Sequence, residues 1–561
     1  MIETAAPTKR SHNEDLKEGN PLLGGTIAQT LADPTKDSFT HDDYEFLKFH
    51  GVYQQDDRDQ RKVAKHYMLM VRTKFPGGAL SAAQYLACDQ LASQYGNQTL
   101  RVTTRQDFQF HGVLKTNLRQ TIHELNRVLI TTIAACGDVE RNITAPPAPV
   151  SSPLAEQVLT EARRLSRALT PVTTAYHQIW IEGKELDLRP EEHPTFVDPL
   201  YGKQYLPRKF KTGFAIPPRN DVEILTNDLG YIVIAEGDRL VGYNLAAGGG
   251  LGMSHGNPQT FPRLADVIGF LTPEHLERAT KAVIGIHRDY GDRANRKHAR
   301  LKYIIAERGV DWFRGEVERR ANVKLAPARP FEFTQHGDTL GWQRQTNGNW
   351  YLGLFVQNGR IQDSEGYRLR SGLRAVVERH QPEVRLTPSQ NVLLVNVSGA
   401  DREAVTRCLA EHGVSVENPF SPTRLASMAC PSLPTCGLGL AESERFLPTL
   451  LTRFEALLEE VGLAGEEFIL RMTGCPNGCA RPSTAEIAFV GKAPGRYQIC
   501  LGGNVASTRL NRVFRDGVKE TDLIAELRPV LVRFRQERGP GERFGDWCRR
   551  TLWEQMAPIG N

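Results

Sequence analysis

The pattern of apolar and polar residues repeats along the chain on the scale of a domain. Residues 67–113 align without gaps on residues 351–397, and each copy has the pattern of a strand, a turn, an amphipathic helix and a second strand. The aligned pairs include Tyr67 with Tyr351, Leu69 with Gly353, Arg101 with Arg385, Thr103 with Thr387, and Gln106 with Gln390. A duplication of this size predicts two half-domains that share one core.

A weaker second repeat relates the segments that follow the two copies. FKTGFAIPPRND near residue 210 is similar to LRMTGCPNGCAR near residue 470, and GYNLAAGGG at 242 is similar to RYQICLGGN at 496. We therefore expect a multi-domain α+β protein with an internal pseudo-twofold, in which a ligand binds between the halves. The expected limits are 1–60 for an N-terminal extension that wraps the core or binds a partner, 61–140 with 335–410 for the paired half-domains, 141–334, and 411–561.

Two further segments carry apolar residues at helical spacing, residues 152–169 and residues 442–462. The Pro-rich segment 145–153 is a predicted boundary. The first 20 or so residues are polar, and we expect them to be disordered or to become ordered on a partner.

Composition places the chain among soluble globular proteins, with 40% apolar and 24% charged residues. The polar N-terminus lacks the apolar core of a signal peptide, and no apolar run is long enough to span a bilayer, so we expect a cytoplasmic protein without a membrane partner. The net charge of +5 is small for 561 residues and is not gathered into basic runs, so no nucleic-acid partner is expected.

Four of the nine cysteines, Cys430, Cys436, Cys475 and Cys479, fall within 50 residues. Four thiolates suit an iron-sulfur cluster or a tetrahedral zinc ion, and plain buried cysteines are the third interpretation. The C-x5-C and C-x3-C spacings are less typical of zinc sites than of a cluster. A proline follows Cys430 and Cys475, and Gly474 and Gly478 directly precede Cys475 and Cys479, which predicts tight loops with amides directed at sulfur.

Residues 101–111 have a strict period of two, which predicts one strand with a polar face. The polar positions are Arg101, Thr103, Arg105, Asp107, Gln109 and His111. The simplest interpretation is a solvated edge strand. The alternative is a wall for a carboxylate-rich ligand, because arginine binds carboxylates bidentately.

Four further basic residues, Arg72, Arg141, Lys209 and Lys211, carry weight only if the fold brings them together. Lys209 and Lys211 share one face of a predicted strand. The Gly-rich segment 247–252 does not match G-x-G-x-x-G, and we find no Walker A motif. We therefore expect that the chain binds no NAD(P) itself and that electrons come from a partner.

Several stretches together resemble one family, the sulfite and nitrite reductases that use sirohaem coupled to a 4Fe-4S cluster. The resemblance runs from about residue 20 to the C-terminus, and its stretches are FHGVYQQDDRD, RVTTRQDFQFHG, LPRKFKT, GGGLG, SMACPSLPTC, TGCPNGC and VGKAPGRYQICLGGN. It implies paired ferredoxin-like half-domains followed in each half by an α/β domain that binds sirohaem, with the cluster in the second. The chain is most similar to the members that reduce sulfite in sulfate assimilation and cysteine biosynthesis.

The resemblance also implies site residues. Cys430, Cys436, Cys475 and Cys479 would hold the cluster, and Cys479 would also be the axial ligand of the sirohaem iron. The residues matched to sirohaem binding are Arg101, Thr103, Arg105, Gln109, His111, Arg208 and Asn477, with Gln390 and Asn391 from the second copy beside Arg385 and Thr387. Arg72, Arg141, Lys209 and Lys211 would surround sulfite, with both lysines as proton donors.

The same resemblance implies six-electron reduction of sulfite to sulfide, with electrons from NADPH through a separate flavoprotein subunit. Ferredoxin is the alternative donor, and CARP after the last cysteine occurs in ferredoxin-dependent relatives. Nitrite-reducing relatives tend to have Asn at the position of Lys211, which favours sulfite. The non-enzyme alternative is a zinc-stabilised structural protein, which does not explain the basic residues.

Overall fold

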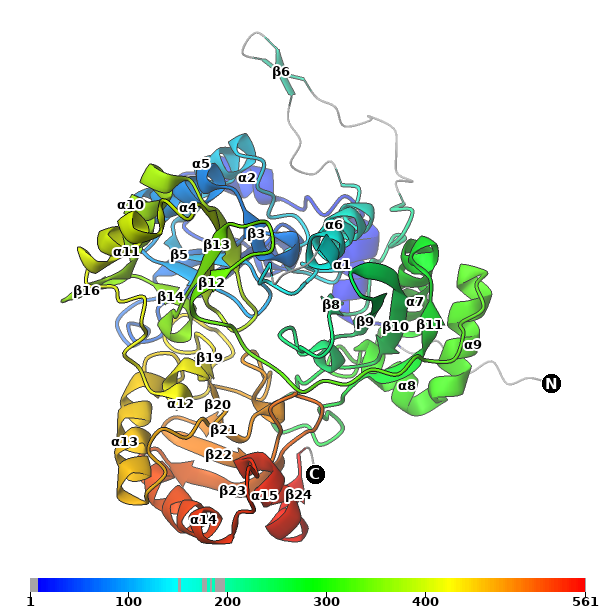
Figure 1. Cartoon of the computed structure of the whole chain (residues 1–561). Coiled ribbons are helices and arrows are strands. Elements are labelled where there is room, and N and C mark those ends of the chain that lie inside the picture. Colours follow the sequence, from blue (N-terminus) through cyan, green and yellow to red (C-terminus); the bar gives the residue numbers. More distant parts are fainter. Residues whose placement is uncertain (1–8, 150–152, 174–178, 182–183, 187–196, 560–561) are drawn as a thin grey trace.

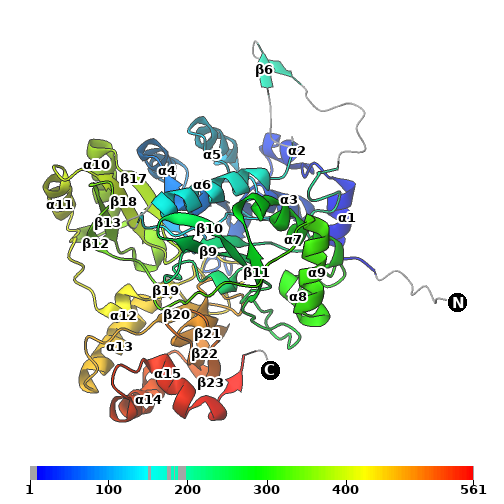
Figure 2. The same ribbon diagram turned by 45° about the vertical axis from the view of Figure 1, so that its right-hand side comes forward.

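A computed structural model of the chain describes residues 9–149, 153–173, 179–181, 184–186 and 197–559. Its elements form two half-domains side by side, a first α/β unit, and a second α/β unit at the C-terminal end (Figure 1). The turned view shows the C-terminal unit in contact with the other groups at β19 and β20 (Figure 2). No helix in the described ranges is long and apolar enough to cross a membrane.

The half-domains are two five-stranded sheets that exchange strands. The first sheet has the order β1 (Val52–Asp56), β2 (Tyr67–Arg72), β5 (Phe108–Val113), β4 (Leu100–Val102) and β14 (Arg360–Ile361). The second has the order β12 (Gly341–Arg344), β13 (Trp350–Leu354), β18 (Val392–Val397), β17 (Glu383–Leu386) and β3 (Ala79–Leu80). Because β14 and β3 each belong to the other half in sequence, the two sheets form one interlocked unit, which confirms the duplication.

The alignment of the two copies without gaps is wrong at its start. Strand pairing equates Arg72 with Gly353, since Arg72 pairs with Gln109 and Gly353 with Leu393. The gapless alignment instead placed Leu69 on Gly353, three positions away. The second copy absorbs the difference before its helix, where β15 (Asp363–Ser364) and β16 (Tyr367–Arg368) form a small hairpin.

The strand expected over residues 101–111 is also wrong, because the chain reverses there. Residues 103–107 form the turn of a hairpin between β4 and β5, in which Arg101 pairs with Gln109. Thr103 N donates to Asp107 O at 2.9 Å, and Gln106 adopts a φ of 59°. A turn can preserve the alternation of polar residues by chance, so periodicity could not distinguish the hairpin from one strand.

Four helices belong to the half-domains, and three more come from the N-terminal segment. In the half-domains they are α4 (Ala82–Gln94), α5 (Lys115–Arg127), α10 (Leu369–His380) and α11 (Arg402–Ala410). The N-terminal segment contributes α1 (His12–Gly19), α2 (Ile27–Ala32) and α3 (His41–Phe49), followed by the edge strand β1. The part of the first 20 residues that the structure describes is therefore mainly helix α1, contrary to the expected disorder.

The two α/β units have related sheets. In the first, β8 (Thr212–Ala215) runs parallel to β9 (Leu229–Glu236), which β10 (Arg239–Ala247) and β11 (Asp266–Leu271) extend in antiparallel fashion. In the second, β20 (Leu470–Thr473) runs parallel to β21 (Ile487–Ala493), followed by antiparallel β22 (Arg496–Leu501) and β23 (Arg512–Lys519). Short strands β19 (Met428–Ala429) and β24 (Ala557–Pro558) complete the second sheet. This shared topology agrees with the second repeat.

Helices pack on both α/β sheets. The first unit has α6 (Pro153–Ala168), α7 (Leu276–Tyr290), α8 (Leu301–Arg308) and α9 (Val310–Ala321), and β6 (Ile179–Ile181) pairs with β7 (Lys184–Leu186) outside it. The second has α12 (Pro422–Leu425), α13 (Leu447–Glu460), α14 (Leu523–Glu537) and α15 (Phe544–Thr551). Both segments predicted from helical spacing are helices, α6 and α13, and α13 buries Leu450, Leu451 and Phe454 as expected.

Candidate active site

Backbone pairing brings the basic segments around Arg141 and Lys209 together. Phe210 N donates to Val139 O at 3.1 Å, and Arg141 N donates to Phe210 O at 3.1 Å. Thr144 N donates to Thr212 O at 3.2 Å, which continues the same parallel contact. We call residues 138–144 and 206–214, paired in this way, the cation ladder. Arg141 therefore lies beside Lys209 and Lys211, although 67 residues separate it from the nearer lysine in sequence.

The charges on the cation ladder act on one another. Burial, followed by the charges of Arg141, Arg300 and Arg208, lowers the pKa of Lys209 to about 7. Burial and the charge of Lys209 hold the pKa of Lys211 well below its ordinary value. Lysines with depressed pKa values release and take up protons near neutral pH.

These cations have no carboxylate partners. The Arg141 guanidinium donates only to Gly137 O, at 3.3 and 3.2 Å. In the parts of the chain that the structure describes, the side chains of Arg72, Arg208, Lys209 and Lys211 make no ion pair and no hydrogen bond to a protein group. Several half-buried cations without an anion are unfavourable on their own and are typical of a site for a small oxyanion or a carboxylate-rich ligand.

Arg72 reaches this site from the first half-domain. It ends β2 and pairs with Gln109 on β5, which in turn pairs with Arg101 on β4. The three side chains therefore lie in one row across three neighbouring strands. The polar face predicted for residues 101–111 exists in part, but it belongs to a sheet and not to a single strand.

Several buried polar atoms in this row have no hydrogen-bond partner. They are Arg72 Nε, Gln109 Oε1 and both ring nitrogens of His111. Burial, and then the charges of Arg360 and Arg101, hold the pKa of His111 well below its ordinary value, so the ring is neutral. Because buried polar groups are nearly always paired, these atoms point to a polar ligand that covers them.

The other predicted sirohaem residues of this hairpin make hydrogen bonds within the protein, although Arg105 Nε is buried without a partner. Arg101 pairs with Glu444 at 2.9 Å and donates to Ala429 O at 2.9 Å. Arg105 donates to Asn227 Oδ1 at 2.6 Å and to Thr212 O at 2.8 Å. Thr103 Oγ1 accepts from Arg105 N at 3.1 Å. These contacts show Arg101 and Arg105 tying the hairpin to both α/β units.

The second copy of the hairpin has the same turn and different contacts. Thr387 N donates to Asn391 O at 3.0 Å, as Thr103 does to Asp107 in the first copy. The Thr387 hydroxyl and the Asn391 side-chain amide both donate to Asp338 Oδ2, and the distance from Asn391 Nδ2 is 2.9 Å. Arg385 pairs with Glu156 at 2.7 Å, and Gln390 Oε1 is buried without a partner. Of these residues, only Gln390 therefore keeps an unpaired atom for a ligand.

The four predicted cysteine ligands lie on two adjoining loops. Gly474 N donates to Cys430 Sγ at 3.3 Å, and Asn477 Nδ2 donates to Cys475 Sγ at 3.5 Å, which confirms the expected contacts to sulfur. Burial raises the pKa of Cys475 to about 11, and the charge of Cys479 is the next cause. Burial also raises the pKa of Cys430 and the pKa of Cys436, and in both the charge of Cys479 is the second cause. The four thiols therefore form one group.

The cysteine group can be compared with the sites that bind a single metal ion. Over the described residues, no three His, Cys, Asp or Glu side chains are placed to hold one metal ion. In a 4Fe-4S cluster each thiolate binds a different iron, so the four sulfurs stand further apart than around one zinc ion.

The cysteine group adjoins the cation ladder. The charge of Cys479 is among the causes that raise the pKa of Lys209, of Lys211 and of Arg72, against the effect of burial. Thr104 Oγ1, in the first hairpin turn, donates to Cys479 O at 3.1 Å. The thiol group and the uncompensated cations are therefore parts of one site between the two halves.

The Gly-rich segment 247–252 supports the cysteine loop. Met253 N donates to Pro476 O at 2.9 Å, and a Cβ on Gly252 would lie 3.1 Å from Asn477 O. Lys302 Nζ holds the segment by donating to Gly250 O at 3.0 Å and Gly252 O at 2.9 Å. The glycines thus permit close packing of two loops.

Sequence reasoning missed the buried carboxylates that organise the site. Asp228 accepts from Arg300 at 2.7 Å and from Lys211 N at 3.0 Å, which fixes the backbone of Lys211. Glu444 joins Arg101 to Arg360, and Arg360 Nε donates to Glu444 Oε1 at 2.6 Å. No local pattern marks these residues, because each partner lies far away in the sequence.

Comparisons with known proteins agree with this arrangement. Residues 61–128 and 343–412 match the nitrite/sulfite reductase ferredoxin-like half domain, and residues 160–325 match the nitrite and sulphite reductase 4Fe-4S domain. The second match covers the first α/β unit and none of the four cysteines, which lie in the related second unit.

Relatives are similar over nearly the whole chain. Proteins named NADPH sulfite reductase hemoprotein beta-component from Methylocella silvestris, Myxococcus xanthus and Staphylococcus saprophyticus are 47%, 46% and 44% identical. The alignments cover 98%, 97% and 97% of this chain and 96%, 97% and 96% of those proteins. The solved structure of the Mycobacterium tuberculosis NirA protein has the same fold, with a TM-score of 0.78, 24% identity and 96% of each chain covered.

Proposed function

The chain belongs to the nitrite and sulfite reductase family, and we propose that it reduces sulfite to sulfide as the haemoprotein component of an NADPH-dependent sulfite reductase. The observation that carries this proposal is the set of uncompensated cations beside a group of four thiols. A small dianion such as sulfite would supply the missing negative charge.

The residues present fit the cofactors of the family. Cys430, Cys436, Cys475 and Cys479 would hold a 4Fe-4S cluster, with Cys479 shared with the sirohaem iron. The free cations and the ring N–H of the neutral His111 suit the many carboxylates of sirohaem, while the unpaired Oε1 atoms of Gln109 and Gln390 can accept a hydrogen bond from a ligand donor. The remaining proposed contacts are Arg101, Thr103, Arg105, Arg208, Asn391 and Asn477, of which Arg101 and Arg105 act mainly through protein contacts. When bound, the two cofactors accumulate the electrons for the reduction and supply the iron that binds sulfite.

The protein's part in the reaction is to bind the oxyanion and to deliver protons. Arg72 and Arg141 remain charged at all relevant pH values and hold the anion. Lys209, with a pKa of about 7, gives up its proton at little cost near neutral pH, and burial with the charge of Lys209 holds the pKa of Lys211 well below its ordinary value. Proton donors matched to the working pH are the most effective in catalysis. Asp228 keeps Lys211 in place by accepting its backbone N–H.

We further propose that electrons come from NADPH through a separate flavoprotein subunit. The relatives' shared name, beta-component, supports a second component. Ferredoxin is the competing donor. Reduction of sulfite with NADPH and a flavoprotein partner, but not with reduced ferredoxin, is the expected result, and the reverse would replace the flavoprotein by ferredoxin.

The experiment that tests the function combines a spectrum with turnover. The purified chain should contain iron and acid-labile sulfide, show sirohaem absorption, and reduce sulfite to sulfide with a chemical reductant. A colourless protein that contains zinc would contradict the proposal. Faster turnover of nitrite than of sulfite would move it to the nitrite-reducing members of the family.

A further inference from the structure

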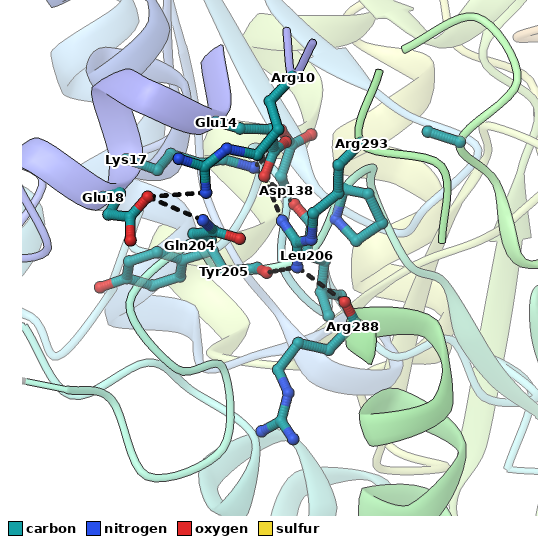
Figure 3. Close-up of polar contacts among 12 residues, drawn as sticks. Arg10, Glu14, Lys17, Glu18, Asp138, Gln204, Tyr205, Leu206, Arg288 and Arg293 are labelled. Atoms are coloured by element: carbon teal, nitrogen blue, oxygen red, sulfur yellow. Dashed lines mark hydrogen bonds and ion pairs between the residues drawn. The ribbon is translucent and has the colours of Figure 1, made fainter. Parts of the chain in front are cut away.

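A buried group of charged side chains lies against the start of the cation ladder, outside the proposed catalytic residues (Figure 3). We call it the N-terminal ion cluster; its members are Glu14 and Lys17 on α1, Asp138, Arg293 and Arg296. Lys17 Nζ lies 2.7 Å from Glu14 Oε1 and 3.5 Å from Asp138 Oδ2. The side chains of Glu14 and Lys17 are 0% and 3% exposed, although α1 lies near the N-terminus.

Two arginines complete the cluster from the segment that follows α7. Arg293 pairs with Glu14, and Arg296 contacts Asp138 with Nη1 at 2.7 Å and with Nη2 at 3.2 Å. Burial alone would raise the pKa of Asp138, but the charges of Arg296 and Lys17 hold that pKa well below its ordinary value. The Asp138 carboxyl is therefore charged in the folded protein, while burial lowers the pKa of Lys17 against the opposing charges of Asp138 and Glu14.

The three cations of the cluster converge on three consecutive carbonyl groups. Arg293 Nη2 donates to Tyr205 O at 2.8 Å, and Lys17 Nζ donates to Leu206 O at 2.8 Å. Arg296 Nη1 donates to Pro207 O at 3.4 Å. These carbonyls belong to the residues directly before Arg208 and Lys209.

The backbone of residues 205–207, which accepts hydrogen bonds from the cluster, is strained at Tyr205. Tyr205 has a φ of 54°, a region that an aromatic residue rarely adopts. Its hydroxyl donates to Pro21 O at 2.7 Å, and its ring stacks on Tyr201 at 5.9 Å. Such a conformation persists only where the surroundings fix it, so the path into the cation ladder is held by the N-terminal segment.

The cluster also fixes the opposite side of the ladder. Leu206 N donates to Asp138 O at 3.0 Å, which is the first contact of the ladder. Arg141 follows Asp138 by three residues in sequence. One set of charges thus holds the beginning of both basic segments.

Stability does not account for this arrangement. Taking charged side chains out of water is costly, and apolar side chains of similar size often stabilise a fold as well or better. A buried ionic group is better explained where it imposes one geometry. Here that geometry is the placement of the residues that bind the oxyanion.

We propose that α1 is part of the sulfite site: Lys17, supported by Glu14, is a positioning residue that sets the path of residues 205–208 and thereby places Lys209 and Lys211. This inference rests on the proposed function for its substrate. The placement itself rests on the contacts of α1 with the cation ladder.

The test is Lys17→Met in the full-length holoenzyme, assayed for sulfite reduction with reduced methyl viologen so that no protein donor is needed. Since small displacements at an oriented site have large kinetic effects, we expect the KM for sulfite to rise about tenfold and kcat to fall with it, because the same displacement moves the proton donors Lys209 and Lys211. Cofactor absorption should be unchanged. Hydrogen exchange of the amides in residues 206–212 should become faster, and Lys17→Arg should restore most of the wild-type KM.

The matched control is Asp89→Asn on α4, which also disrupts a buried ion group. Asp89 is 0% exposed and pairs with Arg370 and Arg374. This control should lower the unfolding temperature and leave the KM for sulfite unchanged. If Lys17→Met does not fold, Glu14→Gln is the milder variant of the same cluster, with the same expected rise in KM.

Two outcomes separate the proposals. A Lys17→Met protein that unfolds earlier but keeps the wild-type KM and wild-type exchange at residues 206–212 would make the cluster merely structural. A wild-type holoenzyme that does not reduce sulfite would instead overturn the proposed function, and the exchange measurement would still decide whether α1 holds the ladder.

Discussion

At the scale of single residues, the site depends on groups whose charge state the fold has changed. Lys209 is the clearest case, because burial and the neighbouring cations lower its pKa to about 7. A lysine in water stays charged up to a pKa near 10.5. The same side chain can therefore attract the oxyanion and give up a proton within the physiological range.

The first prediction follows from the sign of this shift. Below pH 7 Lys209 is protonated and attracts the oxyanion, and above it the charge is lost, so the KM for sulfite should rise as the pH increases from about 6 to 8. Lys209→Arg keeps the charge at both ends and should remove this part of the pH dependence. A steady-state pH series of both proteins separates the titration of the lysine from that of sulfite itself.

The second prediction concerns Lys211. Lys211→Met should retain the absorption of the cofactors and lose at least about a hundredfold in sulfite turnover, since a positioned proton donor contributes about 10²–10⁴ in rate. Lys203→Met, an exposed lysine on the same segment, should behave as wild type. Loss of the haem absorption in Lys211→Met would mean that the residue is structural.

The third prediction concerns the cysteines. Cys479→Ser should lose both the cluster and its coupling to the haem, because the proposed ligand serves both cofactors. Cys408→Ala, a cysteine on α11 away from the group, should keep both. Iron and sulfide content together with the absorption spectrum measure this. An intact coupled spectrum in Cys479→Ser would remove the axial-ligand assignment.

At the scale of elements, the exchange of β3 and β14 between the half-domains holds the two hairpin turns toward each other. Gly359, which leads into β14, has a φ of 75° and approaches the other half closely. A Cβ at this position would lie 2.4 Å from Val102 O and 3.0 Å from Gln390 Cβ. The exchange is therefore possible only with glycine here.

The fourth prediction tests this close approach. Gly359→Ala should lower the free energy of unfolding by more than about 3 kcal/mol, because backbone strain and a clash with backbone add together. Gly366→Ala is the matched control, with a φ of 71° and open space around it, and should lose only about 1 kcal/mol of strain. Denaturant unfolding of the two variants compares them, and equal losses would show that the clash is relieved.

At the scale of the whole molecule, buried ion groups join the half-domains to the unit that carries the cysteines. Glu444 binds Arg101 and Arg360 from the two half-domains, and its backbone N–H donates to Cys430 O at 3.1 Å. A change in the half-domain interface is therefore expected to reach the cysteine loop.

The fifth prediction concerns this junction. Glu444→Gln should destabilise the protein by about 3 kcal/mol, since breaking a largely buried pair leaves two arginines without their anion, and should lower the cluster content. Glu442→Gln, whose partner Arg445 is exposed, should cost less than about 1 kcal/mol. The unfolding midpoint and iron content measure both. Full iron content in Glu444→Gln would separate the junction from the cluster site.

The comparison between sequence and structure differs from one feature to another. The duplication, helices α6 and α13 and the cysteine group could be predicted, because local period and spacing carry them. The hairpin over 103–107 was missed because its turn keeps the polar alternation of a strand. The three-position shift at β2 was missed because β15 and β16 add residues without disturbing the flanking patterns.

The sequence by itself determined the family, the repeat and the types of residue at the site, because motifs and periodicity are local properties of the chain. Only the tertiary structure decided which cations lie together without a carboxylate partner. It also decided that Arg101 and Arg105 connect the hairpin to the α/β units, and that α1 contacts the residues before Lys209. Those features depend on partners far apart in the sequence, such as Lys17 and Leu206, and burial fixes their charge and geometry only after the chain has folded.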